Sequence, residues 1–438
     1  MKKWFFSFSI LFFGANSLNA QLSENLQDLK SYIESQKNIQ LDSIPFLSIY
    51  RNKELHYLYP LYNAFHQTNK LQAAVGNEQY LLDLGVSAAF AGDYASVLAI
   101  EKIGYEGQLT DSIKKDIVAH PNLFDGITLT DAKKYIRENI KNQKIVMINE
   151  LPNKPQHRVF TASLLAEFYE QGFRYLAMET LNPYSNGSLK QINMLSGHYT
   201  CEPIGGELAR KAIAMGFSLV AYEDSSFNHT PNKKMYAQAQ NIYKILQKDP
   251  TAKILVQAEG THNEEGARSE NAIPMAAYFK IVSGIDPLTI DQTGMTEGSN
   301  HAYGAAIYDF YTKRFAINTS VVCLKDNKSK DVFDENLCDI YVVHPPTKFK
   351  NGRANWNSMN GLRTETAIQP IYQSLFFVQA YYTKEYNEKY LGKLVPADQT
   401  YINAQDGYYY LYLQKGHYQL VYRDKQYKIL GTKVLVVE

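Results

Sequence analysis

The stretch IVMINELPNKPQHRVFTASLL, residues 145–165, decides the fold. It begins with a short apolar and largely β-branched run, Lys144–Asn149, which predicts a buried strand. After this run, apolar residues recur at a four-residue spacing, at Phe160, Leu164 and Phe168, which predicts an amphipathic helix. A strand followed by a helix that packs on it is the unit from which parallel sheets are built.

The same unit recurs between about Gly126 and Asp291. Further strands are expected at Arg174–Met178, Ser218–Tyr222, Lys253–Gln257 and Pro287–Ile290, with helices at about Gly206–Met215 and Lys233–Gln247. The fold class that follows is α/β, with a largely parallel sheet flanked by helices.

The residues before and after this core show other patterns of apolar residues. Residues 21–125 form a helical domain in this prediction, with segments at Glu24–Gln36, Glu54–Gln72 and Glu78–Ile103. The core domain extends over 126–365 and includes a strand at Asp339–Val343. The last part, 366–438, is expected to be a small antiparallel β module, with strands at Tyr408–Leu413, Tyr418–Tyr422 and Lys433–Val437.

The first 20 residues have the composition of a signal peptide. Lys2 and Lys3 precede an apolar run at Trp4–Gly14 that is too short to cross a bilayer, and Ala20 provides a small residue for cleavage. We therefore expect an exported protein, periplasmic or secreted. No later window approaches roughly 20 uninterrupted apolar residues, so no transmembrane segment is expected after cleavage.

The charge balance argues against nucleic acid as a partner. Loss of Lys2 and Lys3 takes the formal net charge from +1 to −1, and no later basic run is longer than Lys233-Lys234. The expected partner is instead a small-molecule or peptide substrate or ligand.

Three cysteines leave two alternatives open. Cys323 and Cys338 flank a polar turn between two apolar runs, so they either form a disulfide across a hairpin or are two small buried residues. Cys201 is expected to be a buried, inert thiol, because nothing nearby indicates a lowered pKa.

Acidic residues follow four of the predicted core strands. Glu150, Glu179, Glu223 and Glu259 each stand at or just after a strand end, although Asp and Glu together occupy only 44 of 438 positions. In open α/β sheets the ligand crevice lies outside the carboxyl ends of the strands. The sequence therefore predicts a shared functional pocket in which Glu179, Glu223, Glu259 and Arg210 bind a ligand.

Clustered carboxylates need a cation, a basic partner or a raised pKa. His157 and Arg158 follow the first strand and His262 follows the fourth, so these residues and Glu150 are the catalytic candidates. One expectation is a divalent metal, Mn, Fe or Zn, bound by Glu150, Glu179 and His262, because carboxylate and imidazole ligands suit these ions. The alternative is that some of these glutamates cap helices or pair with Arg158 and Arg210.

Several familiar catalytic signatures are absent from the sequence. It contains no Gly-x-Ser-x-Gly elbow, no His-Glu-x-x-His helix, no phosphate-binding loop and no dinucleotide fingerprint. Serine-hydrolase and NAD-dependent functions are therefore not expected.

Three strings together resemble the erythromycin esterase/ChaN/Tiki superfamily. They are IVMINELPNKPQHRVFTASLL at 145–165, GFRYLAMETLN at 172–182 and YTCEPIGGELARKAIAMGFSLVAYED at 199–224. The resemblance extends over roughly Gly126–Gln292, with a weaker likeness in DIYVVHPPT at Asp339–Thr347.

This resemblance implies hydrolase chemistry, since the superfamily includes esterases and metal-dependent peptidases beside haem-binding lipoproteins. The implied site residues are Glu150, Arg158, Glu179, Glu223 and His262.

The chain also departs from the superfamily pattern. Pro152 and Asn153 stand where relatives have a histidine, and Gln257 or Glu259 stands at a second histidine position. Asn cannot accept a proton at neutral pH, so His157 is the expected substitute.

Three functions follow. The first is a secreted hydrolase, of the esterase or metal-dependent amidase or peptidase type, in which Glu150 and His157 activate water, His262 assists and Arg158 stabilises the oxyanion. The second is a catalytically degenerate binding protein for haem, metal or glycan in the same crevice. The third is a surface interaction protein whose helical and β modules contact a partner.

Overall fold

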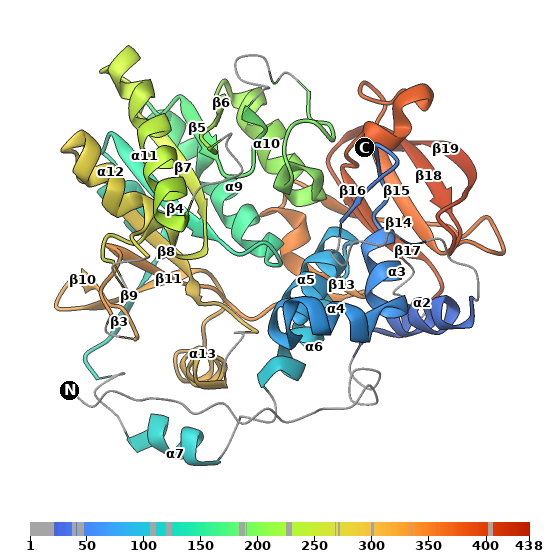
Figure 1. The fold of residues 1–438 in the computed structure, drawn as a ribbon, viewed down its shortest axis with the longest axis horizontal. Coiled ribbons are helices and arrows are strands. Elements are labelled where there is room, and N and C mark those ends of the chain that lie inside the picture. Colours follow the sequence, from blue (N-terminus) through green and yellow to red (C-terminus); the bar gives the residue numbers. More distant parts are fainter. Residues whose placement is uncertain are drawn as a thin grey trace.

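The computed structural model describes residues 22–36, 41, 48–105, 111–119, 125–183, 189, 191–224, 230–267, 269, 272–298, 302–333, 335–401 and 406–438. The expected signal peptide, residues 1–20, lies outside these described residues. The chain forms N-terminal helices, a central sheet with helices on both faces, and C-terminal antiparallel strands (Figure 1). The α/β fold class expected from the sequence is thereby confirmed.

The central sheet contains all five strands that the core pattern predicts. They are β4 (Ile145–Glu150), β5 (Tyr175–Met178), β6 (Ser218–Ala221), β7 (Ile254–Glu259) and β8 (Leu288–Met295). Together with β11 (Ile340–Val343) they run parallel in the order β11-β8-β4-β7-β5-β6. Antiparallel strands β3 (Thr128–Asp131), β9 (Val321–Lys325) and β10 (Lys328–Ser329) extend the sheet beyond β11.

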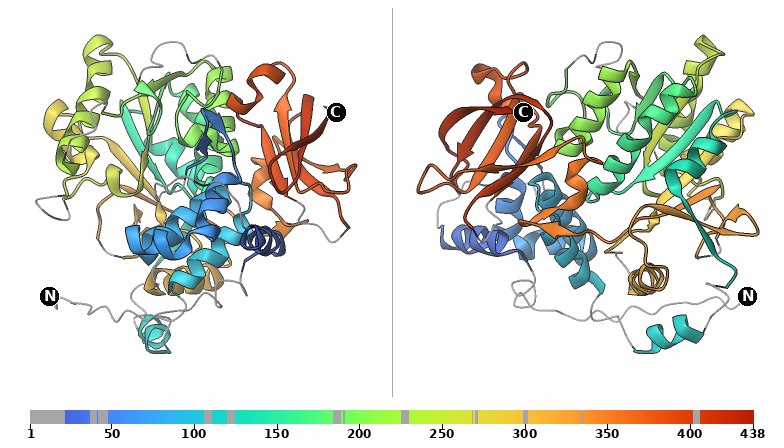
Figure 2. Two further views of the ribbon diagram at one scale, coloured as in Figure 1. Left: turned by 45° about the vertical axis from the view of Figure 1, so that its right-hand side comes forward. Right: turned by 180° about the vertical axis from the view of Figure 1, so that it is seen from behind.

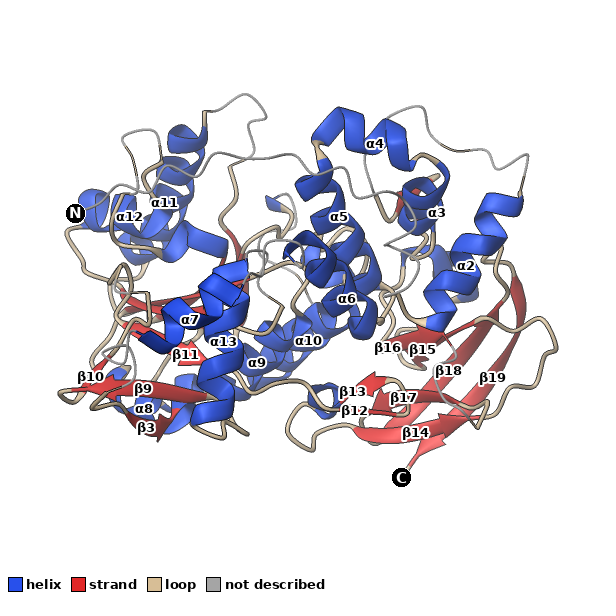
Figure 3. Cartoon of the chain, turned by 90° about the horizontal axis from the view of Figure 1, so that it is seen from below, coloured by secondary structure: helices blue, strands red, loops and turns tan. Residues whose placement is uncertain are grey.

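Helices cover both faces of this sheet, and strand alternation decides which side chains meet them. In β4, Val146 and Ile148 pack on the face of α8 (Ala132–Asn139), α9 (Pro155–Glu170) and α10 (Pro203–Met215). Ile145 and Met147 pack on the opposite face, against α11 (Pro231–Lys248) and α12 (Met275–Ser283). Near the outer strands, α7 (Asp111–Ala119) and α13 (Ala302–Arg314) lie side by side (Figure 3).

The N-terminal part is less regular than the sequence indicates. Its helices are α2 (Glu24–Ser35), α3 (Tyr59–His66), α4 (Thr68–Val75), α5 (Asn77–Phe90) and α6 (Tyr94–Tyr105). The expected helix at 54–72 was wrong at its start, because β1 (Tyr50–Arg51) and β2 (Glu54–Leu55) form a hairpin there. The expected helix at 78–103 is interrupted where Gly92 has a left-handed φ of 83° and Asp93 accepts the backbone N–H of Ser96.

The C-terminal strands form two small antiparallel sheets. One pairs β14 (Thr364–Ile368) with β17 (Tyr409–Leu413), and the other has the order β16 (Asp398–Tyr401), β15 (Phe377–Tyr382), β18 (Gly416–Arg423), β19 (Ile429–Val437). A short hairpin, β12 (Phe349–Lys350) with β13 (Arg353–Ala354), connects them to the core. These strands lie beside α10 and the N-terminal helices (Figure 2).

Short 3-10 helices shape the connections between these elements. They are η4 (Tyr199–Cys201), η5 (Gly260–Asn263), η6 (Asn355–Ser358) and η7 (Glu388–Lys393). Of these, η4 contains Tyr199, and η5 directly follows β7 and contains His262.

The alternative of a Cys323–Cys338 disulfide was wrong, because all three cysteines are free thiols. Cys323 packs in an apolar cluster with Ile117 and Tyr311, whereas the thiol of Cys338 donates to the carbonyl of Asn263, at 3.9 Å. The two sulfurs thus face different surroundings. Over the part of the chain that the structure describes, no helix has the length and apolarity to cross a bilayer.

Candidate functional site

The structure brings the four strand-end glutamates to one edge of the sheet. Glu150 of β4 and Glu259 of β7 stand opposite each other in register. Glu179 and Glu223 follow the next two strands, β5 and β6. Because neighbouring strands are about 4.8 Å apart, the four residues stand in a row along this edge of the sheet.

Strand alternation divides this row between the two faces of the sheet. Glu150 follows the alternation of Val146 and Ile148, and therefore turns toward α9, where it contacts Arg158. Glu179 stands one residue beyond Met178, which packs on the α9 face, so it turns the other way and contacts Gln238 of α11. The acids thus form two groups along one edge.

The first group surrounds Arg158, which is completely buried. Its Nε donates to Glu150 Oε2 at 2.8 Å, and its Nη1 donates to Glu202 Oε2 at 3.2 Å. Gln257 of β7 also donates to Glu150, and Glu202 caps the start of α10 by accepting the N–H groups of Ile204 and Gly205.

Two carboxylates therefore share one guanidinium. Burial raises the pKa of Glu150 to about 7, although Arg158 and Gln257 favour its charged form. Burial likewise raises the pKa of Glu202. Burial alone would lower the pKa of Arg158, but its two acidic partners raise it, so the arginine stays charged.

The second group centres on Glu179 and His262. His262, on η5, places Nδ1 3.0 Å from Glu179 Oε2, and the same oxygen accepts the backbone N–H of Glu259 at 2.7 Å. The ammonium of Lys234 lies 3.7 Å from Glu179 and 3.7 Å from Glu223. Between those two acids, the amide nitrogen of Gln238 donates to both.

These contacts set the charge states of the pair. Burial would raise the pKa of Glu179, but the hydrogen bond and charge of His262 lower it. Burial would lower the pKa of His262, but Glu179, with a further effect of the Glu259 charge, raises it. Glu179 is therefore the ionised acceptor and His262 Nδ1 the donor, which leaves Nε2 as the second functional atom of the ring.

Glu259 connects the two groups. Its carboxylate accepts a hydrogen bond of 2.7 Å from the hydroxyl of Tyr199, on η4. The ring of Tyr199 lies 5.0 Å from the guanidinium carbon of Arg158. Glu259 also contributes to the raised pKa values of both Glu150 and His262, so its charge acts on both groups.

His157 and Arg210 lie outside these groups. His157 is buried, accepts the N–H of Leu151 at Nδ1 and lies 3.3 Å from Thr296 at Nε2, and burial lowers its pKa well below the usual value. Arg210 of α10 pairs with Glu385 of the C-terminal part at 2.8 Å.

The expected metal ligands do not fit one metal ion. Glu150 is held by Arg158 and Gln257, whereas Glu179 and His262 contact each other. Within the described ranges, no three His, Cys, Asp or Glu side chains are placed to share an ion.

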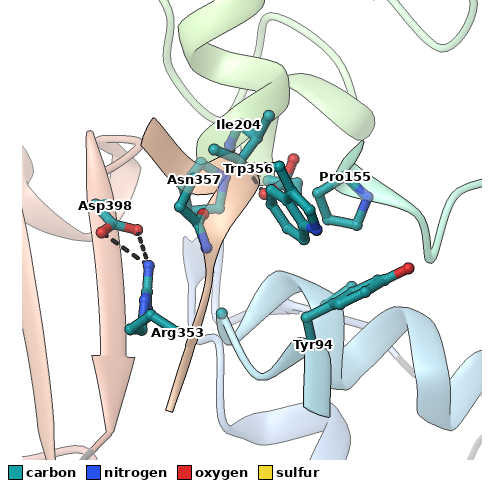
Figure 4. Close-up of a pocket in the computed structure, with 11 residues that line it drawn as sticks. Tyr94, Pro155, Ile204, Arg353, Trp356, Asn357 and Asp398 are labelled. Atoms are coloured by element: carbon teal, nitrogen blue, oxygen red, sulfur yellow. Dashed lines mark hydrogen bonds and ion pairs between the residues drawn. The ribbon is translucent and has the colours of Figure 1, made fainter. Parts of the chain in front are cut away.

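A small cavity lies beside the first group, at the junction of the three parts of the chain (Figure 4). Its walls include Tyr94 of α6, Glu202 and Ile204 of the core, and Trp356 with Arg353, which is paired to Asp398. The volume of about 10 Å³ is at the lower limit for one water molecule. This cavity is too small for an organic substrate.

Sequence reasoning missed four polar residues that complete the site: Glu202, Tyr199, Lys234 and Gln238. Glu202 had a usable signal, because an acid directly before Pro203 and an apolar helix is typical of a helix N-cap. The other three lie on η4 and α11, and no local pattern separates them from ordinary surface residues.

No family model matches the chain, and no curated protein matches it. Several solved structures match parts of it, and two of them show how weak the likeness is. One, described as "Bacterial protein toxins", is 15% identical with a TM-score of 0.29, over 62% of this chain and 65% of its own length. The other, the signal recognition particle receptor FtsY from Elizabethkingia anophelis, is 11% identical with a TM-score of 0.18, over 53% and 84%. The resemblance to the erythromycin esterase-like superfamily gains no support from these matches and stays a prediction.

Proposed function

We propose that the chain is a hydrolase of carboxylic esters or amides, with His262 as the general base. The observation that supports this most directly is the Glu179–His262 pair, in which a buried carboxylate holds Nδ1 of an imidazole that is 23% exposed. A carboxylate that fixes the tautomer and orientation of a histidine is a recurrent device for proton abstraction.

In the proposed reaction, Nε2 of His262 takes a proton from water as the water oxygen bonds to the substrate carbonyl carbon. The ammonium of Lys234, whose side chain is 42% exposed, lies 3.7 Å from Glu179 and would stabilise the oxyanion. His262 then returns the proton to the leaving oxygen or nitrogen as its bond to carbon breaks.

Glu150 and Arg158 have a different role in this proposal from the one the sequence suggested. The guanidinium of Arg158 already donates to Glu150, Glu202 and the carbonyl of Pro152. We therefore assign Glu150 and Arg158 to holding the ends of β4 and β7 in place. His157, with both ring nitrogens in contacts, is not part of the proposed reaction.

Export is also proposed, on the basis of residues 1–20 alone. Expression of the whole chain in a Gram-negative host, followed by N-terminal sequencing of the extracytoplasmic fraction, should give a chain beginning near Gln21. Retention of the intact N-terminus in the cytoplasm would contradict export.

The test of the enzyme assignment is turnover by the purified chain from residue 21 onward. Nitrophenyl acetate and butyrate and the matching nitroanilides are the first probes. His262→Ala should lower kcat by about 100-fold or more, since a general base contributes about 100- to 10,000-fold. His66→Ala, at an exposed position at the end of α3, is the matched control and should leave kcat unchanged.

Two results would contradict the proposal. One is turnover that His262→Ala leaves intact, and the other is no turnover of any ester or amide by folded protein. The second result would favour the binding-protein alternative.

A further inference from the structure

Both oxygens of the Glu179 carboxylate are held by groups from different elements. Oε2 accepts the backbone N–H of Glu259 at 2.7 Å and lies 3.0 Å from Nδ1 of His262. Oε1 faces α11, where the amide nitrogen of Gln238 lies at 3.3 Å and the ammonium of Lys234 at 3.7 Å. A carboxylate that is held at both oxygens does not rotate freely, so its Oε2 stays directed at the histidine.

Gln238 makes this contact from an enclosed position. Its side chain is completely buried, and its amide nitrogen also donates to Glu223 at 3.0 Å. The two acids fix which way the amide faces, because the reverse orientation would place its oxygen against both carboxylates. Lys234, one turn earlier on α11, is partly exposed and carries rotatable N–H donors on a flexible stem, so it imposes no such direction.

A glutamine at this position has a cost that an apolar residue would avoid. Among the described residues, Oε1 of Gln238 is buried and has no donor, which is unfavourable. The other buried residues of α11 are apolar: Met235, Ala239, Ile242 and Leu246. Packing alone therefore does not explain the glutamine. Functional sites are the usual places where such local costs are retained.

A second unfavourable feature directly follows Glu179 in the chain. Thr180 has a left-handed φ of 64°, which is strained for a β-branched residue. Its N–H donates to Glu223, its Oγ1 accepts the N–H of Tyr199, and its carbonyl accepts the N–H of His198. Strain that the surroundings maintain in this way is concentrated at functional sites. Two costs are thus retained next to Glu179, and both bear on how its carboxylate is placed.

We propose that Gln238 is a positioning residue: it orients Glu179, which in turn keeps His262 in the tautomer with the proton on Nδ1. This role rests on the proposed hydrolase function. Neutral histidine carries a proton on only one ring nitrogen, so a proton fixed on Nδ1 leaves Nε2 free to take the proton of water. Without Gln238, only the flexible Lys234 remains at Oε1, and the carboxylate can turn away from the ring.

The first test compares the tautomer of His262 in the wild type and in Gln238→Met, which keeps the volume of the side chain but removes its amide. In protein with isotope-labelled histidine, the nitrogen chemical shifts report the tautomer at a pH where His262 is neutral. The His262→Ala variant identifies the signals. The wild type should carry the proton on Nδ1, and in Gln238→Met a substantial fraction should carry it on Nε2.

Turnover of nitrophenyl acetate is the second readout. Gln238→Met should lower kcat about 10- to 100-fold, the usual effect of losing a group that orients a catalytic side chain. KM should stay nearly unchanged, because Gln238 does not touch the substrate. Gln238→Asn keeps the amide on a shorter side chain and should give an intermediate kcat. Gln240→Met, at an exposed position of the same helix, is the matched control and should change neither kcat nor the tautomer.

Urea unfolding separates positioning from support of the fold. The midpoint of Gln238→Met should change little, because methionine removes an unpartnered acceptor together with two hydrogen bonds. A large fall in midpoint with an unchanged tautomer of His262 would show a purely structural role and overturn the inference. If Gln238→Met does not fold, the same measurements on Gln238→Asn decide.

The tautomer is measured without substrate, so the positioning role and the hydrolase can fail separately. An unchanged tautomer and kcat in both Gln238 variants of an active protein would overturn the positioning role and leave the hydrolase intact. A changed tautomer with an unchanged kcat would likewise overturn it. A changed tautomer in a protein that turns over no ester or amide would contradict the hydrolase, while it would support the control of His262 by Gln238.

Discussion

Replacing Arg158 by methionine should cost the protein about 3–5 kcal/mol of stability, the usual result of removing one partner of a buried ion pair. The structure shows why the cost should lie in this range. Arg158 donates to Glu150 at 2.8 and 3.4 Å, to Glu202 at 3.2 Å and to the carbonyl of Pro152 at 3.3 Å. Methionine fills most of the volume but leaves two buried carboxylates without a cation.

Urea unfolding at neutral pH measures this cost. Far-ultraviolet circular dichroism reports on the whole chain, and the fluorescence of Trp356 reports on the junction, where its ring contacts Tyr94 at 5.0 Å. Coincident transitions and an unchanged slope would show that the shift in midpoint is a change in stability.

Two further variants make the result interpretable. Arg137→Met removes an exposed arginine that pairs with Glu170, with side chains 56% and 59% exposed, and should cost less than about 1 kcal/mol. A triple variant with Arg158→Met, Glu150→Gln and Glu202→Gln should recover much of the loss, because no buried charge is left unpaired. A loss below about 1 kcal/mol in Arg158→Met alone would refute the argument that this arginine compensates two buried acids.

Three other perturbations test the site and its surroundings. The rate of hydrolysis should rise with pH, with an inflection at the raised pKa of His262. Glu179→Gln should move this inflection in the pH–rate profile to lower pH, and an inflection at the same pH in the variant would contradict the proposed Glu179–His262 pair. Because burial raises the pKa of Glu150 from 4.5 to about 7, the folded state binds its proton more tightly, and the wild type should lose stability as pH rises through this window. Glu150→Gln lacks this loss. The urea midpoint of the variant should therefore rise relative to that of the wild type between about pH 5 and pH 8, and a difference in midpoint that does not change with pH would be evidence against the raised pKa. Gly92→Ala should lower the unfolding midpoint by several degrees, because its Cβ would lie 2.3 Å from a carbonyl oxygen of β16. Gly126→Ala has a similar positive φ but no neighbour within 4 Å, so thermal unfolding should show a smaller loss, and equal losses would exclude the close approach as the cause.

The core of the fold was predictable because its strands are continuous apolar runs. Lys144–Asn149 and Lys253–Gln257 differ from the observed β4 and β7 by no more than two residues at either end. Buried parallel strands need side chains that are apolar on both faces, and that requirement is visible in a single sequence.

The division of the acids into two groups was not predicted, although the rule behind it is simple. If an acid is displaced by one residue relative to the end of its strand, its side chain points to the opposite face of the sheet. Glu150 is the last residue of β4, whereas Glu179 is the first residue beyond β5. Strand ends cannot be assigned to a single residue from the sequence, so the facing of each acid could not be assigned either.

The environment of His157 could not be predicted from the sequence either. Its nearness in sequence to Glu150 suggested a shared site, but its ring turns toward Thr296 and lies stacked 5.5 Å from that of His344. These two partners lie far along the chain, and only the tertiary fold brings them together. Likewise, Lys234 and Gln238 are one turn apart on α11, and nothing in the local pattern indicates that they meet Glu179.

The contacts between the two ends of the chain have a consequence for how it folds. Lys425 pairs with Asp28, 397 positions earlier, and the amide of Gln399 donates to the carbonyl of Phe90, 309 positions earlier. Contacts of such sequence separation slow folding, because a long loop must close before they form. During synthesis, the N-terminal helices cannot complete these contacts until nearly the last residue has been made. If the chain is exported, this delay would help to keep it unfolded until it has crossed the membrane.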